Sequence, residues 1–245
     1  MNAAKILREK IKNPASITTG MIVTYHFWPG IVELAMRSGM DYIIIDLEHL
    51  SHDTNMVVEA CAMGRRENFP VLIRPATCEF TYMRLAMDLG PCGLLVPYVE
   101  TAEDMREIQD AIYLKPRGRR RPGGRGNFWV NDFNYETWQK EVEDDLIILP
   151  QIESKVGLDN LEVIASHPVT TAMAVGPYDL SADLGVCWNP TSQVLINALQ
   201  RIKEAAKTQH KNMWMIGNGV ELIQQGYNFI CLTEPTMFLE AKLRE

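Results

Sequence analysis

The chain has 245 residues, of which 47% are hydrophobic and 22% charged, and its formal net charge is −7. This is the balance of an ordinary globular protein with a sizeable core, and the excess of acid argues against nucleic-acid binding, which requires a basic face. The N-terminal residues lack the apolar core of a signal peptide, and no apolar run approaches the length of a membrane span. The five cysteines are odd in number and scattered, which favours reduced thiols, so we expect a cytoplasmic protein that binds no membrane.

Strand-like and helix-like segments alternate along most of the chain. Residues 2–12 come first, as a short basic amphipathic helix that should cover one end of the fold. The strand-like segments that follow are 21–25, 41–46, 70–74, 93–99, 146–151, 170–175, 213–216 and 228–232. The helix-like segments after them are 29–38, 51–66, 80–89, 102–113, 155–166, 191–209, 219–225 and a final helix from 235.

This alternation predicts the fold class. Strands that each lead into a helix require βαβ crossovers and a parallel sheet. Eight such units in 245 residues are typical of a closed (β/α)8 TIM barrel, so we expect one α/β domain that spans 1–245. The first strand is not followed by G-x-G-x-x-G, which argues against a dinucleotide-binding sheet.

Polar side chains follow several of these strands. The segment 41–49 is a buried apolar run that turns polar only at its last residues. Catalytic groups of such barrels lie at the C-terminal ends of the strands, so these positions are candidates for a site. The alternative is that the acids cap the next helices or form surface ion pairs. The side chains at these strand ends are Glu48, His49, Arg74, Gln151, Glu153 and Asp179.

Glu153 and Asp179 stand in equivalent places after neighbouring strands. Because parallel strands lie about 4.8 Å apart, the two carboxylates can bind one cation. Two oxygen ligands suit Mg²⁺ or Mn²⁺ with open positions, and they do not suit a closed zinc site. Either carboxylate alone would be interpreted as a helix cap, whereas the pair favours a metal site.

Asp88 lies within an otherwise apolar helical segment, where an unpaired carboxylate would be costly if buried. It needs a partner, and His49 is a candidate. Arg74 directly ends an apolar strand, which places its cation poorly for bulk solvent. A lone histidine is more often structural than catalytic, and Arg74 would also serve as an ordinary ion-pair partner.

Six segments together have the order and spacing of a known enzyme family: DLEH at 46–49, RP at 74–75, 85–90 with Asp88, LLVP at 94–97, QIESK at 151–155 and GPYDLS at 176–181. They resemble the HpcH/HpaI aldolases over nearly the whole chain. These are metal-dependent class II pyruvate aldolases that act on 4-hydroxy-2-oxo acids and 2-keto-3-deoxy sugar acids.

The resemblance implies reversible cleavage of such an acid to pyruvate and an aldehyde, with Mg²⁺, Mn²⁺ or Co²⁺ stabilising the enolate of pyruvate. It also implies a (β/α)8 barrel whose last helix is exchanged between neighbours in a homo-oligomer, a trimer or hexamer. The implied roles are metal ligation for Glu153 and Asp179, an acid/base dyad of His49 with Asp88, a cation facing the keto acid for Arg74, and substrate binding for Gln151, Gly176, Pro177 and Tyr178.

Some segments depart from the family pattern. The arginine-rich sequence at 117–123 has an arginine in place of a glycine, followed by a proline, and Tyr178 stands where alanine is common. The segments after strands seven and eight, 217–219 and 233–236, also differ. These places lie on the side of the second substrate, so they leave the identity of the aldehyde open.

Three rival functions are considered. A Schiff-base aldolase needs a lysine at a strand end, and Lys155, the nearest, is interpreted as a helix start. A CoA-ester lyase of the citrate lyase β or malyl-CoA lyase type would share the metal pair. A non-catalytic anion-binding barrel would use the basic segment 115–125, whose charges either pair with the acids of 141–145 or attract anionic substrates. Its cations are Lys115, Arg117, Arg119, Arg120, Arg121 and Arg125.

Overall fold

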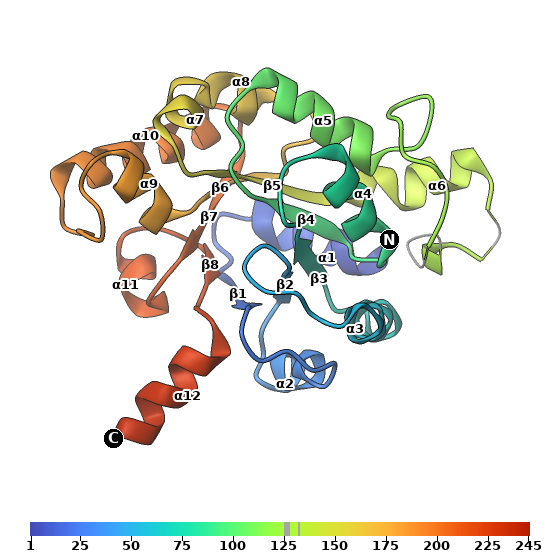
Figure 1. The fold of residues 1–245 in the computed structure, drawn as a ribbon, viewed down its shortest axis with the longest axis horizontal. Helices are drawn as coiled ribbons and strands as arrows, with labels where there is room; N and C mark the ends of the chain where they lie inside the picture. Colours follow the sequence, from blue (N-terminus) through green and yellow to red (C-terminus); the bar gives the residue numbers. More distant parts are fainter. Residues whose placement is uncertain (125–127, 132) are drawn as a thin grey trace.

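Eight parallel strands close into a barrel in the computed structural model, and helices surround it (Figure 1). The structure describes residues 1–124, 128–131 and 133–245. The strands pair in chain order and β8 returns to β1, which confirms the predicted (β/α)8 TIM barrel. The strands are Thr18–Val23 (β1), Tyr42–Asp46 (β2), Val71–Arg74 (β3), Gly93–Val96 (β4), Ile147–Ile152 (β5), Ala172–Val175 (β6), Asn212–Ile216 (β7) and Phe229–Cys231 (β8).

The helices follow the strands as predicted, with a few additions. A short 3₁₀ helix, Glu143–Asp145, precedes β5. The α-helices of the described chain are Asn2–Lys12 (α1), Ile31–Arg37 (α2), Thr54–Glu67 (α3), Phe80–Asp88 (α4), Ala102–Ile112 (α5), Tyr135–Glu141 (α6), Lys155–Asp159 (α7), Leu161–Ser166 (α8), Pro177–Asp183 (α9), Gln193–Thr208 (α10), Gly219–Gln224 (α11) and Pro235–Arg244 (α12).

The structure differs from the sequence-based prediction at three helices. The predicted helix 155–166 is divided at Asn160, whose φ of −107° and ψ of 15° leave the helical region. The helices α6 and α9 were not predicted. Each has seven residues, about two turns, which is too short to show a clear helical period. Asn134 caps α6 by accepting a hydrogen bond from the Thr137 N–H.

The barrel interior is packed across several strands. Every residue of β2 is buried, as expected for a strand of a parallel barrel. The hydroxyl of Tyr42 donates a hydrogen bond to the Ile230 carbonyl (2.9 Å) and accepts one from Trp214 Nε1 (2.8 Å). Gly20 makes room for this ring, because a Cβ there would stand 2.6 Å from its Cε1 and Cζ atoms. The polar group of this buried tyrosine is therefore satisfied inside the core.

Helix α1 covers the N-terminal end of the barrel, as predicted. Arg8 Nη1 donates a hydrogen bond to the carbonyl of Leu146, which directly precedes β5 (2.6 Å). The side-chain amide of Asn212, the first residue of β7, donates to the Ile11 carbonyl (2.9 Å). The C-terminal end of the barrel is therefore the end left for a catalytic site.

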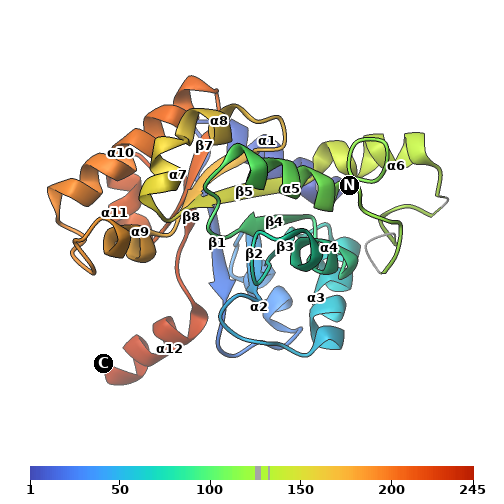
Figure 2. The ribbon, with the colours of Figure 1, turned by 45° about the horizontal axis from the view of Figure 1, so that its top comes forward.

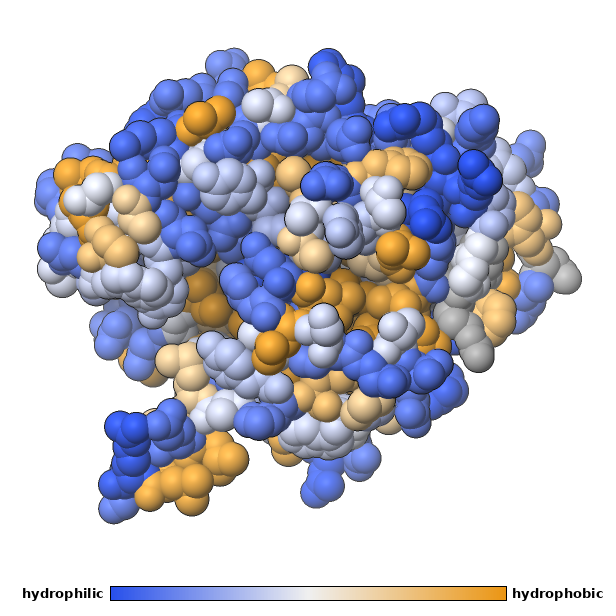
Figure 3. Space-filling model, viewed as in Figure 1, coloured by the Kyte–Doolittle hydropathy of each residue, from blue (hydrophilic) through white to orange (hydrophobic). Residues whose placement is uncertain are grey.

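Helix α12 projects away from the barrel (Figures 1 and 2). None of its residues is buried, and one of its faces is hydrophobic (Figure 3). No described helix is long and apolar enough to cross a membrane, and this includes α12. The exposed apolar side chains of α12 are Met237, Phe238, Leu239 and Leu243.

Candidate active site

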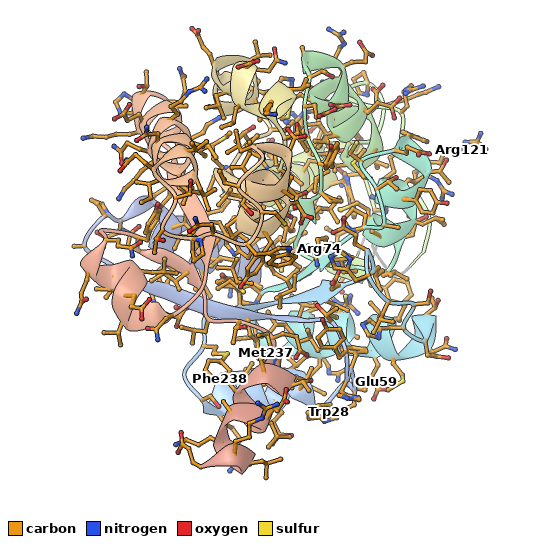
Figure 4. All side chains as sticks on the ribbon, turned by 60° about the vertical axis from the view of Figure 1, so that its left-hand side comes forward. Trp28, Glu59, Arg74, Arg121, Met237 and Phe238 are labelled. Atoms are coloured by element: carbon orange, nitrogen blue, oxygen red, sulfur yellow. The ribbon has the colours of Figure 1, made fainter. Side chains whose placement is uncertain are left out.

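Arg74 and Asp46 form a buried ion pair at the C-terminal ends of β3 and β2, and Figure 4 shows Arg74 near the centre of the molecule. Arg74 Nε and Nη2 donate hydrogen bonds to the two Asp46 oxygens at 2.8 and 2.6 Å. The Thr24 hydroxyl donates a further one. Burial alone would raise the pKa of Asp46, but the hydrogen bonds and charge of Arg74 lower it. Asp46 therefore stays ionised and fixes the guanidinium.

Glu48 and His49 follow β2 beside this pair. Glu48 Oε2 lies 3.0 Å from Arg74 Nη1 and 3.7 Å from His49 Nε2. Burial raises the pKa of Glu48, with Asp46 and Asp179 adding to the effect and Arg74 opposing it. The His49 side chain is 56% exposed, so it is accessible to solvent at the C-terminal end of the barrel.

Glu153 is buried just past β5 and is held from two sides. Gln151 Nε2 donates a hydrogen bond to Oε1 and the Tyr98 N–H donates one to Oε2, both at 2.8 Å. Burial raises the pKa of Glu153 to about 8, and the negative charges of Glu48 and Asp179 contribute. The charged form is therefore costly here unless a cation stands beside it.

Tyr98 is a site residue that the sequence analysis missed. Its φ of 53° places a non-glycine residue in the left-handed region, a conformation that costs free energy and persists only where the surroundings enforce it. This conformation aims its N–H at Glu153. The only available signal was its position two residues after β4, level with the other strand ends.

Gly176 and Asp179 bring β6 into the same site. Gly176 lies against Glu153, since a Cβ there would stand 2.0 Å from Glu153 Oε1. Asp179 lies in the first turn of α9, and its charge acts on both Glu48 and Glu153. Pro177 and Tyr178 begin α9 between them. The structure therefore brings the predicted substrate-binding and metal-binding positions together.

The residues around Glu153 fit a divalent cation. Glu48, Glu153 and Asp179 place three carboxylates within mutual electrostatic reach, and the buried Gln151 Oε1 has no described hydrogen-bond partner. These are oxygen donors, which Mg²⁺ and Mn²⁺ prefer. Among the described residues, no three His, Cys, Asp or Glu side chains form a coordination set by themselves. Water or substrate oxygens would therefore complete the shell.

The predicted pairing of His49 with Asp88 does not form within this chain. Asp88 ends α4, which leads back toward the start of β4, whereas His49 follows the C-terminal end of β2. Asp88 instead accepts hydrogen bonds from Arg84 Nη1 and Arg120 Nη2, both at 2.9 Å. The carboxylate of the apolar helix thus has partners, as expected, but they are arginines.

Three arginines of the basic segment 115–125 pair with acids of their own chain, but of these only Arg117 pairs with acids of 141–145, as one of the two alternatives predicted. Arg120 is buried, so its charge is not offered to solvent. Arg121 is exposed and lies at the periphery, far from Arg74 (Figure 4), and Arg125 lies outside the described residues. The ion pairs are Arg117 with Asp144 (2.7 Å) and Glu143 (3.3 Å), Arg119 with Asp110 (2.5 Å) and Glu107 (3.7 Å), and Arg120 with Asp88 (2.9 Å).

An aromatic pair stands beside the strand ends. The rings of Tyr178 and Trp188 lie 4.6 Å apart between centroids, and both side chains are largely exposed. The Ser181 hydroxyl links them, since it donates to the Tyr178 carbonyl and accepts from the Trp188 N–H. Trp188 was not predicted from the sequence, because it lies ten positions after Tyr178 and no helical or strand period connects the two residues.

Comparisons with known proteins agree with the barrel fold. A model of the family described as HpcH/HpaI aldolase/citrate lyase matches residues 26–230. The chain is similar to a 2-keto-3-deoxy-L-rhamnonate aldolase of Shigella boydii serotype 4 (strain Sb227), with 30% identity over 84% of this chain and 79% of that protein.

Two solved structures have a fold similar to that of this chain. The chain is similar to an HpcH/HpaI aldolase from Desulfitobacterium hafniense DCB-2, with a TM-score of 0.86 and 22% identity over 97% of this chain and 94% of that one. It is less similar to a citrate lyase beta subunit from M. tuberculosis, solved with oxaloacetate and magnesium. For that pair the TM-score is 0.57 and the identity 14%, over 91% of this chain and 94% of the other.

Proposed function

The chain belongs to the HpcH/HpaI aldolase/citrate lyase family, and from this membership we propose that it is a class II aldolase. Its reaction would be the reversible cleavage of a 2-keto-3-deoxy acid, that is, a 4-hydroxy-2-oxo acid, to pyruvate and an aldehyde. The relative that is 30% identical acts on a substrate of this class by its name. A divalent cation, Mg²⁺, Mn²⁺ or Co²⁺, would be the cofactor.

The observation that carries this proposal is the setting of Glu153. It is buried with a pKa raised to about 8, near the charge of Asp179, and Arg74 stands within electrostatic reach. Such perturbed carboxylates cluster at functional sites. Glu153 and Asp179 would hold the cation, which when bound supplies a Lewis acid that polarises the keto acid.

The reaction breaks the bond between C3 and C4 of the substrate. The proton on the C4 hydroxyl leaves, C4 becomes the aldehyde carbon, and the electron pair of the broken bond passes toward C3 and the C2 oxygen. Protonation of C3 then gives the methyl group of pyruvate. Negative charge develops on the C2 oxygen, so a fixed cation near that oxygen lowers the activation free energy of the cleavage.

We assign three roles to the residues of this chain. Arg74, fixed by Asp46, would stabilise the charge that develops on the C2 oxygen. His49 would take and return the proton of the C4 hydroxyl, since its side chain is exposed at the mouth and Glu48 lies 3.7 Å away. Gln151 and the backbone of 176–178 would bind the keto acid beside Glu153.

The rival functions have less support. None of the eight strands contains a lysine, and the exposed Lys155 begins α7, which disfavours a Schiff base. The lower similarity to the citrate lyase beta subunit disfavours a CoA-ester lyase. The internal ion pairs of the arginine segment disfavour a barrel that binds anions through that segment.

Helix α12 supports assembly into a homo-oligomer. Its apolar face is uncovered in the single chain, and contiguous exposed apolar surface of this kind marks an interaction site. We propose that a neighbouring copy covers it, in a trimer or hexamer. A cytoplasmic location stays a prediction.

A pyruvate-release assay over a panel of 4-hydroxy-2-oxo acids tests the function. We expect release from at least one 2-keto-3-deoxy acid, its loss with a chelator, and its recovery with Mg²⁺, Mn²⁺ or Co²⁺. Borohydride added during turnover serves as the control, because it traps pyruvate only on a Schiff-base lysine. Undiminished turnover in chelator, or trapped pyruvate on the protein, would overturn the class II assignment.

A further inference from the structure

A basic groove lies at the N-terminal end of the barrel, opposite the candidate active site. Its volume is about 900 Å³, and its wall includes residues that directly precede or begin strands, such as Ile17, Thr171 and Asn212. A volume of this size is typical of pockets for small molecules, roughly 300–1,000 Å³. The basic residues that line it are Arg8, Lys12, Lys203, Lys207, His210 and Lys211.

The charge of this groove is opposite to that of the protein. The chain carries a formal net charge of −7, yet no Asp or Glu is among the residues that line the groove. The side chains of Lys12 and Lys207 are exposed and take part in no ion pair or hydrogen bond described in the structure. The positive charge is therefore not neutralised within the described chain.

Arg8 and Lys211 are held in place by backbone carbonyl groups. Lys211 Nζ donates hydrogen bonds to the carbonyls of Ala165 (2.6 Å) and His167 (2.8 Å), and Arg8 is tied to the start of β5. Burial, together with the charge of Arg8, lowers the pKa of Lys211 to about 8. Neutral carbonyls fix these cations without cancelling their charge, so they stay available to an anion.

The other side of the groove pairs a cation with a ring. Lys203 Nζ lies 4.4 Å from the ring centroid of Tyr227 and donates a hydrogen bond to the Gln225 carbonyl (3.0 Å). Burial lowers the pKa of Lys203, and the nearby Lys207 contributes. Apolar side chains such as Ile17 complete the wall. A ligand that combines anionic groups with an apolar or ring-containing part would satisfy both surfaces.

We propose that the basic groove binds a small organic polyanion, namely a phosphorylated or polycarboxylated metabolite with an apolar or ring-containing part. Six basic side chains with no carboxylate among them require at least two anionic groups for balance, and the volume limits the ligand to a small molecule. The site is separate from the aldolase chemistry and does not depend on it. A ligand in the groove would lie at the N-terminal end of the barrel, against α1 and the starts of β7 and β8.

Calorimetric titration of the full chain with pyrophosphate, ADP and citrate tests this proposal. Pyrophosphate and ADP represent phosphorylated ligands, and citrate represents polycarboxylated ligands. ADP also carries a ring-containing part. The variant is Lys12→Gln with Lys207→Gln, because neither side chain makes a described contact whose loss would disturb the fold. The matched control is Lys115→Gln with Lys140→Gln, which removes the same charge from exposed sites outside the groove. Each titration is run with and without Mg²⁺.

We expect one saturable site per chain, tighter for ADP than for pyrophosphate and independent of Mg²⁺. The double variant in the groove should weaken binding about tenfold, since each exposed ion pair contributes up to roughly 1 kcal/mol, and the control should bind as wild type does. Citrate binding as tight as that of pyrophosphate would assign the groove to polycarboxylated ligands. The proposal is overturned if none of the three probes binds, if binding requires Mg²⁺, or if both double variants bind equally.

Discussion

Gly176 and Glu153 are in direct contact: a Cβ built on Gly176 would stand 2.0 Å from Glu153 Oε1 and 2.8 Å from its Cδ. No side chain fits at position 176 unless the carboxylate moves. The absence of a side chain at Gly176, directly after β6, thus lets Glu153, directly after β5, place its carboxylate at the mouth of the barrel.

Gly176→Ala should displace Glu153 and reduce turnover about 10²-fold, the effect expected from a misplacement of about 1 Å. Calorimetry should also show weaker binding of Mg²⁺, because the carboxylate would no longer stand where Tyr98 and Gln151 hold it. Gly123→Ala is the control, since a Cβ at Gly123 meets no atom within 4 Å. Wild-type Mg²⁺ affinity in Gly176→Ala would contradict this account of the site.

The stability of the cation-free protein should depend on pH through Glu153. Burial raises its pKa from 4.5 to about 8. Between pH 4.5 and about 8, Glu153 keeps its proton in the folded state but has released it in the unfolded state. The free energy of unfolding therefore falls as pH rises through this range, and Glu153 adds no pH dependence below or above it. Glu153→Gln should remove this slope, as should Mg²⁺, which favours the charged carboxylate. Urea unfolding across the window measures it, and equal slopes in wild type and variant would refute it.

His49→Ala should reduce turnover about 10²–10⁴-fold, the usual contribution of general acid–base catalysis. Mg²⁺ affinity should be nearly unchanged, because His49 is not among the proposed ligands. His52→Ala is the control, since that histidine contacts the Phe27 ring and has no assigned role. Loss of the cation together with activity would show that His49 acts on the metal site instead.

Arg120→Gln should destabilise the protein, whereas Arg119→Gln should not. The Arg120 side chain is fully buried against Asp88, and breaking a buried pair costs about 3–5 kcal/mol, less here because Arg84 also contacts Asp88. Arg119 is 57% exposed, so its loss should cost under about 1 kcal/mol. Urea unfolding compares the two. Equal stabilities would mean that Arg120 is not a structural residue.

Changing the apolar face of α12 should dissociate the assembly. Phe238→Ser with Leu239→Ser removes two exposed apolar side chains from the projecting helix. Sedimentation should show an oligomer for wild type and smaller species for this variant. Val220→Ser, at an exposed valine on α11, should leave the oligomer intact. A wild-type monomer at every concentration would exclude exchange of this helix between copies.

Much of the fold could be predicted from the sequence because each strand carries a local signal. The apolar run of 41–46 ends in an acid and coincides with β2 to within one residue. The run 70–74 ends in Arg74 and also coincides with β3 to within one residue, and both runs place their polar residues at one end of the barrel. The strand ends therefore predicted that Glu48, Arg74 and Glu153 lie at the same end of the barrel, but the ion pair of Arg74 with Asp46 was not predicted.

The partners of these side chains could not be predicted in the same way. The Tyr98 N–H reaches Glu153 through a left-handed backbone conformation, and Gly176 leaves room for Glu153 because it lacks a Cβ. Neither property produces a periodic pattern in the sequence. Arg120 lies in a segment that resembles a solvated loop, yet tertiary packing buries it. Asp88 was expected to need a partner, but which partner depended on the path of 117–124, which local sequence does not determine.

The contact between Tyr178 and Trp188 gives the protein an optical probe of its own. Trp188 is 67% exposed, more than any other tryptophan of the chain, whereas Trp138 and Trp214 are buried. Its indole sits 4.6 Å from the Tyr178 ring, at the start of the helix that carries Asp179. Ligands or ions that alter this end of α9 would change the wavelength and intensity of Trp188 fluorescence, so binding can be followed in unlabelled protein.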